Sequence, residues 1–328
     1  MITRRPVHRL VHRSLGGGGS LGVASFLSFV SVVAFISIVA FAGNAEAQLY
    51  ESVGIRAQGL AGAFVAVADD ASSTWWNPAG LAVGPFFSGI VEHRTGQGTT
   101  DESTLGVAFA VPSLGLSYYR LLIGRTSPPT PTGFTTVGRQ VQIAAGVPAP
   151  SFILDEAGAT VGQSLGKYLV LASTLKHVRA DQTRGDFDVG AMVKLGSARF
   201  GVSAKNLYAP DLTADGTPID RNRQVRVGAA YVPSPGKTVS VIADLDADLT
   251  TTHTAAGDER HIAGGAELRS GRLGVRGGLS GNTVGDVRRS FSAGASLALT
   301  KGFFVDSQLT RGDDDAKRGW GVALRVAY

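Results

Sequence analysis

From residue 85 to the end of the chain, apolar residues alternate with small or polar ones at a period of two. This period is typical of β-strands with one apolar face, and no segment of the region shows a helical period. The last segment is the clearest example, with one face made of Trp320, Val322, Leu324, Val326 and Tyr328. The alternation predicts about fourteen strands, at roughly 85–94, 103–111, 113–122, 156–165, 168–180, 184–194, 197–207, 222–233, 237–249, 258–270, 272–280, 287–299, 301–312 and 317–328. Residues 137–147 are also strand-like, which leaves the position of the fourth strand open.

The connections between these strands alternate in length. They are tight after even-numbered strands, as in "PS" at residue 112, and mostly longer and polar after odd-numbered strands, as in "TGQGTTDE" and "APDLTADGTPID". Short turns at one rim and long loops at the other are typical of an outer-membrane β-barrel whose long loops face outside. We therefore predict an all-β fold, a transmembrane antiparallel β-barrel of about 14 strands over residues 85–328.

A soluble β-sandwich or solenoid is the alternative, because its strands also alternate. Charged residues make up 17% of the chain, whereas soluble domains carry about 25%. Such a chain has too few charges to coat a large soluble surface. A barrel in lipid removes this difficulty, because its apolar face points outward and closure pairs every backbone group.

The N-terminus reads as a targeting segment. Four arginines precede the apolar run "LGVASFLSFVSVVAFISIVAFA", and Ala45 and Ala47 flank Glu46, so residues 1–47 are predicted to be a secretory signal peptide. A transmembrane helix is the alternative, since the run could span a bilayer. Removing the segment lowers the formal charge from +5 to about +2, which gives a nucleic-acid partner little support. We expect the outer membrane of a Gram-negative bacterium, with outer-membrane lipid and the barrel-assembly machinery as partners.

Residues 48–84 precede the barrel and do not alternate. Asn77 is placed to cap a helix that begins at Pro78, a favoured pair because proline has no N–H to satisfy at that position. Asp69 or Asp70 is placed to cap the preceding turn, and Gly80 permits the chain to turn. About 37 residues are too few for an independent core. We expect this segment to pack against the barrel.

The stretch "GLAGAFVAVADDASSTWWNPAGLA" resembles the N-terminal signature of the PorV/PorQ family, which is related to the FadL outer-membrane transporters. The resemblance implies a fourteen-stranded barrel with an N-terminal hatch folded inside it, and Asn77, Pro78 and Ala79 match the Asn-Pro-Ala turn of that hatch. It continues through segments such as "FGVSAKNLYAPDL" over essentially the whole mature chain, although these later segments are mainly barrel pattern. The mature chain is short for a FadL transporter, so the long ligand-capturing outer loops are expected to be reduced.

Four groups of candidate functional residues follow from the pattern and the resemblance. The hatch or gate residues are Gly59, Gly62, Asp69, Asp70, Asn77, Pro78 and Ala79. The candidates for contact with a ligand or the wall are Phe64, Trp75 and Trp76, for which simple packing is the alternative. The candidate lumen charges are Lys176, Arg226, Asp244, Asp246, Glu267, Arg276 and Arg325, with the basic ones available to Asp69 and Asp70. Tyr328 ends an alternating strand and resembles a barrel-assembly signal.

The sequence carries no enzyme constellation. Its six histidines are scattered, cysteine is absent, and no metal or cofactor motif is present, so neither enzyme activity nor a cofactor is expected. Two functions remain. The first is a conduit for small hydrophobic or amphipathic molecules, gated by the hatch. The second is a non-transporting barrel that serves as a platform in type IX-like protein secretion or envelope assembly. The sequence does not identify the cargo, the partner protein or the direction of transport.

Overall fold

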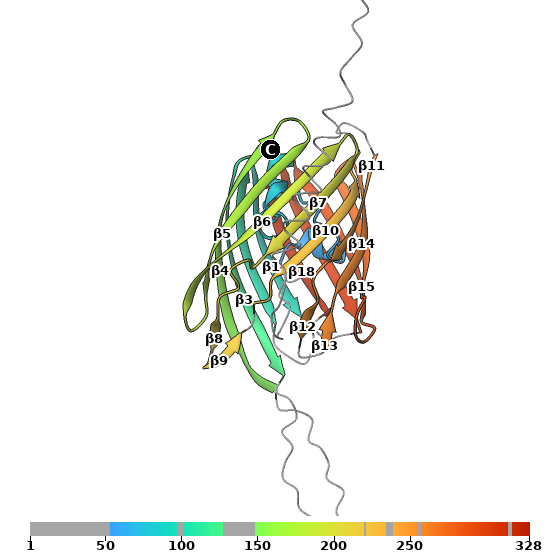
Figure 1. The fold of residues 1–328 in the computed structure, drawn as a ribbon. Helices are drawn as coiled ribbons and strands as arrows, with labels where there is room; N and C mark the ends of the chain where they lie inside the picture. Colours follow the sequence, from blue (N-terminus) through green and yellow to red (C-terminus); the bar gives the residue numbers. More distant parts are fainter. Residues whose placement is uncertain are drawn as a thin grey trace, which may run out of the picture. The chain divides into compact units, whose positions relative to one another are not determined.

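A computed structural model describes residues 53–97, 102–126, 148–219, 221–233, 239–254, 257–313 and 317–328 (Figure 1). The predicted signal peptide, the first residues of the segment that follows it, and the strand-like stretch at 137–147 lie outside these ranges. Within them, no helix has the length and apolar character needed to cross a membrane.

Fourteen antiparallel strands form a closed barrel, which confirms the predicted fold class. Barrel strands that follow one another in the chain pair with one another. β18 closes the barrel by pairing with β1, where Ser88 lies opposite Ala327. The barrel strands are β1 (Ser88–Gly96), β2 (Ser103–Val111), β3 (Leu114–Thr126), β4 (Pro148–Leu165), β5 (Leu169–Arg179), β6 (Thr183–Leu195), β7 (Ala198–Lys205), β10 (Gln224–Tyr231), β11 (Val239–Asp248), β14 (His261–Ser270), β15 (Leu273–Asn282), β16 (Arg289–Thr300), β17 (Phe303–Gly312) and β18 (Gly319–Ala327).

The two faces of the barrel wall differ in chemistry. Buried positions alternate with exposed ones along β2, β5 and β15. The exposed positions are apolar, as at Leu175, Leu279 and Val161, each more than 60% exposed. The inward positions are mostly polar, charged or small, with some large apolar residues such as Leu121 and Leu154 among them. Exposure of so large an apolar belt to water would be unfavourable, so this wall suits the hydrocarbon region of a membrane.

Two small hairpins extend loops that the sequence pattern treated as irregular. β8 (Leu212–Ala214) pairs with β9 (Thr217–Ile219), and β12 (Thr252–Thr254) pairs with β13 (Gly257–Glu259). The turn between β8 and β9 is Asp215-Gly216, and both residues have positive φ, as a two-residue type I′ hairpin requires. Both hairpins lie at the end of the barrel where β1 ends and β2 begins, here called the long-loop rim (Figure 1).

Strand β4 is longer than the alternation predicts. It begins at Pro148 instead of residue 156, and its register with β3 shifts between Ile123 and Arg125. The two prolines at the start of β4 and this shift interrupt the period of two. The early part of the strand therefore has no clean alternation for the sequence to show.

The chain before β1, residues 53–84, is called the N-terminal segment. It contains α2 (Ile55–Gln58), α3 (Ser73–Trp76) and the 3₁₀ helix η2 (Pro78–Val83). Its apolar side chains share one core with inward side chains of the wall, including Tyr119, Leu121 and Leu154. α2 contacts β17, whereas η2 contacts β4, β5 and β6. Strands from both sides of the barrel therefore surround the segment, which is seen among them in blue in Figure 1.

Candidate functional site

Two carboxylates of the wall hold the backbone of the N-terminal segment. Glu92 of β1 accepts hydrogen bonds from the N–H groups of Gly54 (2.8 Å) and Ile55 (3.0 Å). Asp246 of β11 accepts from the N–H groups of Phe64 (2.6 Å) and Val65 (2.7 Å) through one oxygen, Oδ2. Each carboxylate satisfies two buried backbone N–H donors, which would be costly to leave without a partner. The wall thus binds the segment at two turns of its backbone.

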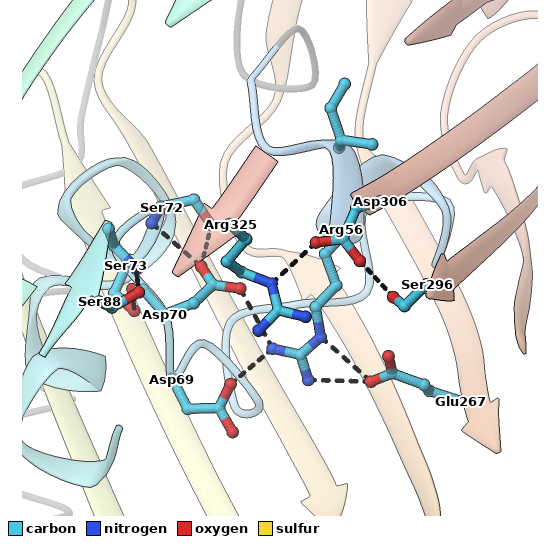
Figure 2. A network of polar contacts seen from close by, with 12 residues as sticks. Arg56, Asp69, Asp70, Ser72, Ser73, Ser88, Glu267, Ser296, Asp306 and Arg325 are labelled. Carbon is cyan, nitrogen blue, oxygen red and sulfur yellow. Dashed lines mark hydrogen bonds and ion pairs between the residues drawn. The ribbon is translucent and has the colours of Figure 1, made fainter. Parts of the chain in front are cut away.

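Arg56 of α2 lies at the centre of a buried ion cluster (Figure 2). Its Nη1 contacts Asp69 at 2.5 Å and Asp70 at 3.3 Å, both within the N-terminal segment, and its Nη2 contacts Glu267 of β14 at 3.0 Å. The cluster joins two distant parts of the segment to each other and to the wall. The basic residues that we expected to pair with Asp69 and Asp70 were on the strands. The basic side chain closest to both aspartates is instead Arg56, which belongs to the segment itself.

The cluster shifts the proton affinity of its members. Burial on its own raises the pKa of Asp69, but the positive charges of Arg56 and two further arginines outweigh it and hold the pKa below its ordinary value of 3.8. Burial lowers the pKa of Arg56, but three nearby carboxylates outweigh it and raise this pKa well above its ordinary range. Both groups are charged at neutral pH.

Asn77 and Pro78 form the turn before η2. The Oδ1 atom of Asn77 accepts from the N–H of Ala79 (3.1 Å), and Pro78 occupies the first helical position. The Nδ2 atom donates to the carbonyl oxygens of Val65 (2.9 Å) and, on β6, Ala191 (3.3 Å). Asn77 therefore caps the helix and also ties the turn to the wall.

Of Asp69 and Asp70, it is Asp70 that caps a turn. Its Oδ1 atom accepts from the backbone N–H and the hydroxyl of Ser72 (3.0 and 2.6 Å). Gly80 serves a different purpose from the predicted one, because its φ is not positive. A Cβ atom there would lie 2.3 Å from the carbonyl oxygen of Ala68, so close packing requires glycine.

Gly59 and Gly62 meet the wall closely. A Cβ atom on Gly59 would lie 2.6 Å from the Arg276 side chain, and Gly62 has a φ of 86°. Matching glycines stand on the wall, where a Cβ on Gly278 would lie 2.4 Å from the backbone of Leu60 and one on Gly201 would lie 2.5 Å from that of Val65. Backbone runs against backbone at these points.

Phe64, Trp75 and Trp76 are buried in contacts within the protein. Trp75 packs edge-on against Tyr119 of β3, at 5.3 Å between ring centroids, and the Lys205 ammonium lies 3.8 Å from its ring centre. The Trp76 Nε1 atom donates to the carbonyl oxygen of Val53 (3.0 Å), and its ring packs edge-on against Phe64. These contacts fit the packing alternative.

No family model matches the chain, and no curated protein sequence matches it. Solved structures are similar to it in fold. The monoaromatic hydrocarbon channel CymD has a TM-score of 0.60 at 12% identity, over 86% of this chain and 99% of that one. The toluene transporter TodX of P. putida has a TM-score of 0.57 at 9% identity, over 85% and 99% of the two chains. The toluene transporter TbuX of Ralstonia pickettii has a TM-score of 0.55 at 12% identity, again over 85% and 99%.

The chain has the fold of these channels. The finer resemblance to PorV and PorQ stays an expectation.

The candidate lumen charges lie on the inward face of this barrel. In one group, Lys176 of β5 contacts Asp188 at 2.6 Å and Asp186 at 3.4 Å. In a second group, Arg226 of β10 contacts Asp248 at 2.5 Å. The neighbouring Asp244 accepts from the N–H of Leu245 (2.9 Å).

The third group joins Glu267, Arg276 and Arg325 through Asp306 of β17. Arg276 lies 3.4 Å from both Glu267 and Asp306, and Arg325 Nε contacts Asp306 at 2.8 Å. Ser296 also donates to Asp306 (Figure 2). The charged side chains of the wall are therefore paired with one another as well as with the N-terminal segment.

Tyr328 lies at the closure of the barrel. Its backbone N–H and C=O form a reciprocal pair of hydrogen bonds with those of Phe87 (2.9 and 3.0 Å), and its ring packs edge-on against Phe303. In the part of the chain that the structure describes, no group of three or more His, Cys, Asp or Glu side chains is arranged to hold a metal ion.

Proposed function

We propose that this protein is an outer-membrane conduit for small hydrophobic or amphipathic molecules, in which the N-terminal segment acts as a hatch. The observation that carries the proposal is the attachment of the segment. Glu92, Asp246 and Glu267 of the wall bind it through hydrogen bonds and one ion pair, inside a barrel whose inward face is mostly polar, charged or small. Such contacts hold a segment in place and are also exchangeable for contacts with water.

The comparisons support the class of cargo and the location. CymD is described as a monoaromatic hydrocarbon channel, and TodX and TbuX as toluene transporters. Their shared fold favours passage of hydrophobic molecules. The apolar outer wall favours a location in the outer membrane, with the long-loop rim outside. The proposal assigns the protein no chemical step, since transport of this kind is passive.

Uptake by cells tests the proposal. A Gram-negative host without a hydrocarbon channel of its own would express the intact protein, and accumulation of radiolabelled toluene would be measured. We expect faster uptake than in cells with an empty vector. Equal uptake in both, with the barrel shown to be folded in the outer membrane, would contradict the conduit.

A second candidate is a non-transporting platform for protein secretion or envelope assembly. It is favoured by the packing of the segment, because Phe64 and Trp76 are fully buried among protein groups. For the platform we expect no change in toluene uptake and co-purification of a secretion-complex protein with the intact barrel.

A further inference from the structure

In the part of the barrel strands that the structure describes, charged side chains on the outer face are confined to one end. Among the described residues of the barrel strands, the charged or histidine side chains that alternate with inward positions and face outward are His93, Arg120, Asp155, His177, Arg179, Arg289 and Arg311. All of them lie in the half of the barrel that ends at the long-loop rim. Four are arginines, and Asp155 is the one acid in this set. The outer face is therefore basic at one rim.

Three of these residues form a row across adjacent strands. Arg120 of β3 is in register with Asp155 of β4, which is in register with Arg179 of β5. Arg120 donates to Asp155 through Nε (2.8 Å) and Nη2 (3.3 Å), and the Tyr118 hydroxyl donates to the same carboxylate (2.8 Å). This holds the Arg120 guanidinium in a fixed orientation, although its side chain is 52% exposed. Two arginines against one aspartate leave the row positive.

The rows beneath it change in a regular order. One step toward the short turns, the outward residues in register are Tyr118, Ala157 and His177. One step further they are Leu116, Ala159 and Leu175, and the two leucines are 51% and 69% exposed. The wall thus passes from apolar through aromatic and imidazole to charged side chains. This order matches a lipid leaflet read from acyl chains to headgroups.

We propose that the row of Arg120, Asp155 and Arg179, together with His177, binds the phosphate of an anionic lipid in the leaflet at the long-loop rim. The acyl chains of that lipid lie against Leu116, Ala159 and Leu175. A guanidinium suits this ligand because its planar N–H groups match phosphate oxygens. Lipid is the partner because the patch continues without a break into an exposed apolar wall, which a lipid covers and a soluble partner does not reach.

Lipid retention tests the proposal. The full protein would be placed in nanodiscs of phosphatidylcholine with a minor fraction of phosphatidic acid, extracted gently, and analysed by native mass spectrometry for bound phosphatidic acid. Each arginine near a lipid surface contributes enough to change retention about fivefold. We expect about a fivefold loss for Arg179→Gln and a larger loss for Arg120→Gln combined with Arg179→Gln.

Lys301→Gln is the matched control, because Lys301 is an exposed base in a short turn at the opposite rim. It should retain phosphatidic acid as the intact protein does. Arg179→Gln alone leaves the contacts among Arg120, Asp155 and Tyr118 in place, so it tests the row if the double variant folds poorly. Retention unchanged in Arg179→Gln, or reduced equally in Lys301→Gln, would overturn the proposal. The proposal needs only a barrel in a membrane, so it can fail while the conduit stands.

Discussion

Arg56 and Glu267 form a buried ion pair, Nη2 to Oε2 at 3.0 Å, across 211 residues of sequence. One residue belongs to the N-terminal segment and the other to strand β14 of the barrel wall. The pair therefore couples the position of the segment to the wall, and its loss is expected to release the segment before it affects the barrel.

Glu267→Gln should loosen the N-terminal segment. Breaking a buried ion pair by removing one partner costs about 3–5 kcal/mol, because the other charge stays buried without compensation. Asp69 and Asp70 still neutralise Arg56, so the lower end of this range is expected. Hydrogen exchange should show faster exchange of amides 54–65, with the strands unchanged. The control is Asp155→Asn, which breaks a more exposed pair on the outer face and should cost much less, because solvent screens that pair. Equal exchange in the two variants would count against the coupling.

Acid should release the contact between Asp69 and Arg56, a second ion pair of the same cluster. The pKa of Asp69 is lower in the folded protein than its ordinary value of 3.8, so its contribution to stability is complete above that value. The contribution falls as pH drops below about 4, through the lower folded pKa. Trp75 and Trp76 lie in the segment, so tryptophan fluorescence during an acid titration reports its release. Asp69→Asn should have a flatter profile between pH 5 and 2. A profile identical to that of the intact protein would refute the assignment.

Gly190 of β6 should tolerate no side chain. A Cβ atom there would lie 2.2 Å from Oδ1 of Asn77, which would force the capping turn away from the wall. Gly190→Ala is expected to lower the temperature at which the N-terminal segment becomes sensitive to protease. Gly185→Ala is the matched control on the same strand, because its nearest neighbour would be 4.0 Å from the new Cβ. Similar protease sensitivity in the two variants would show that the turn is not held there.

Tyr328→Ser should reduce the yield of folded barrel. The exposed ring packs on Phe303 beside the closing pair of strands, and the hydroxymethyl group of serine removes that contact. The backbone hydrogen bonds to Phe87 remain available, so assembly should slow and not stop. The heat-dependent gel shift of the outer-membrane fraction measures the folded share. A share equal to that of the intact protein would show that Tyr328 is dispensable for assembly.

Much of the fold could be predicted because a wall between lipid and lumen imposes a period of two on every strand. The inward positions of Asp246 and Glu267 follow from that period alone. Glu92 was missed although it alternates with Val91 and His93 in the first strand, so the signal was present. The Asp215-Gly216 hairpin also had its signal, since this dipeptide favours a two-residue turn.

Other features leave little trace in the sequence. Arg56 is the only basic residue between positions 48 and 84, and this isolation could have suggested a partner for Asp69 and Asp70. Its contact with Glu267 could not be predicted, because it depends on how an irregular segment lies against a distant strand. The need for glycine at Gly190 is also a property of two packed surfaces, and no local pattern reveals it.

Single-channel conductance tests the central claim most directly. The intact protein and a variant that lacks residues 48–84 would be inserted in planar lipid bilayers, after the heat-dependent gel shift has shown that both barrels are folded. The hatch predicts a clearly higher conductance for the deletion variant, with Glu267→Gln between the two because its segment is loosened and not removed. Equal conductance in the intact and deleted barrels would contradict the account, since the N-terminal segment would then not restrict passage.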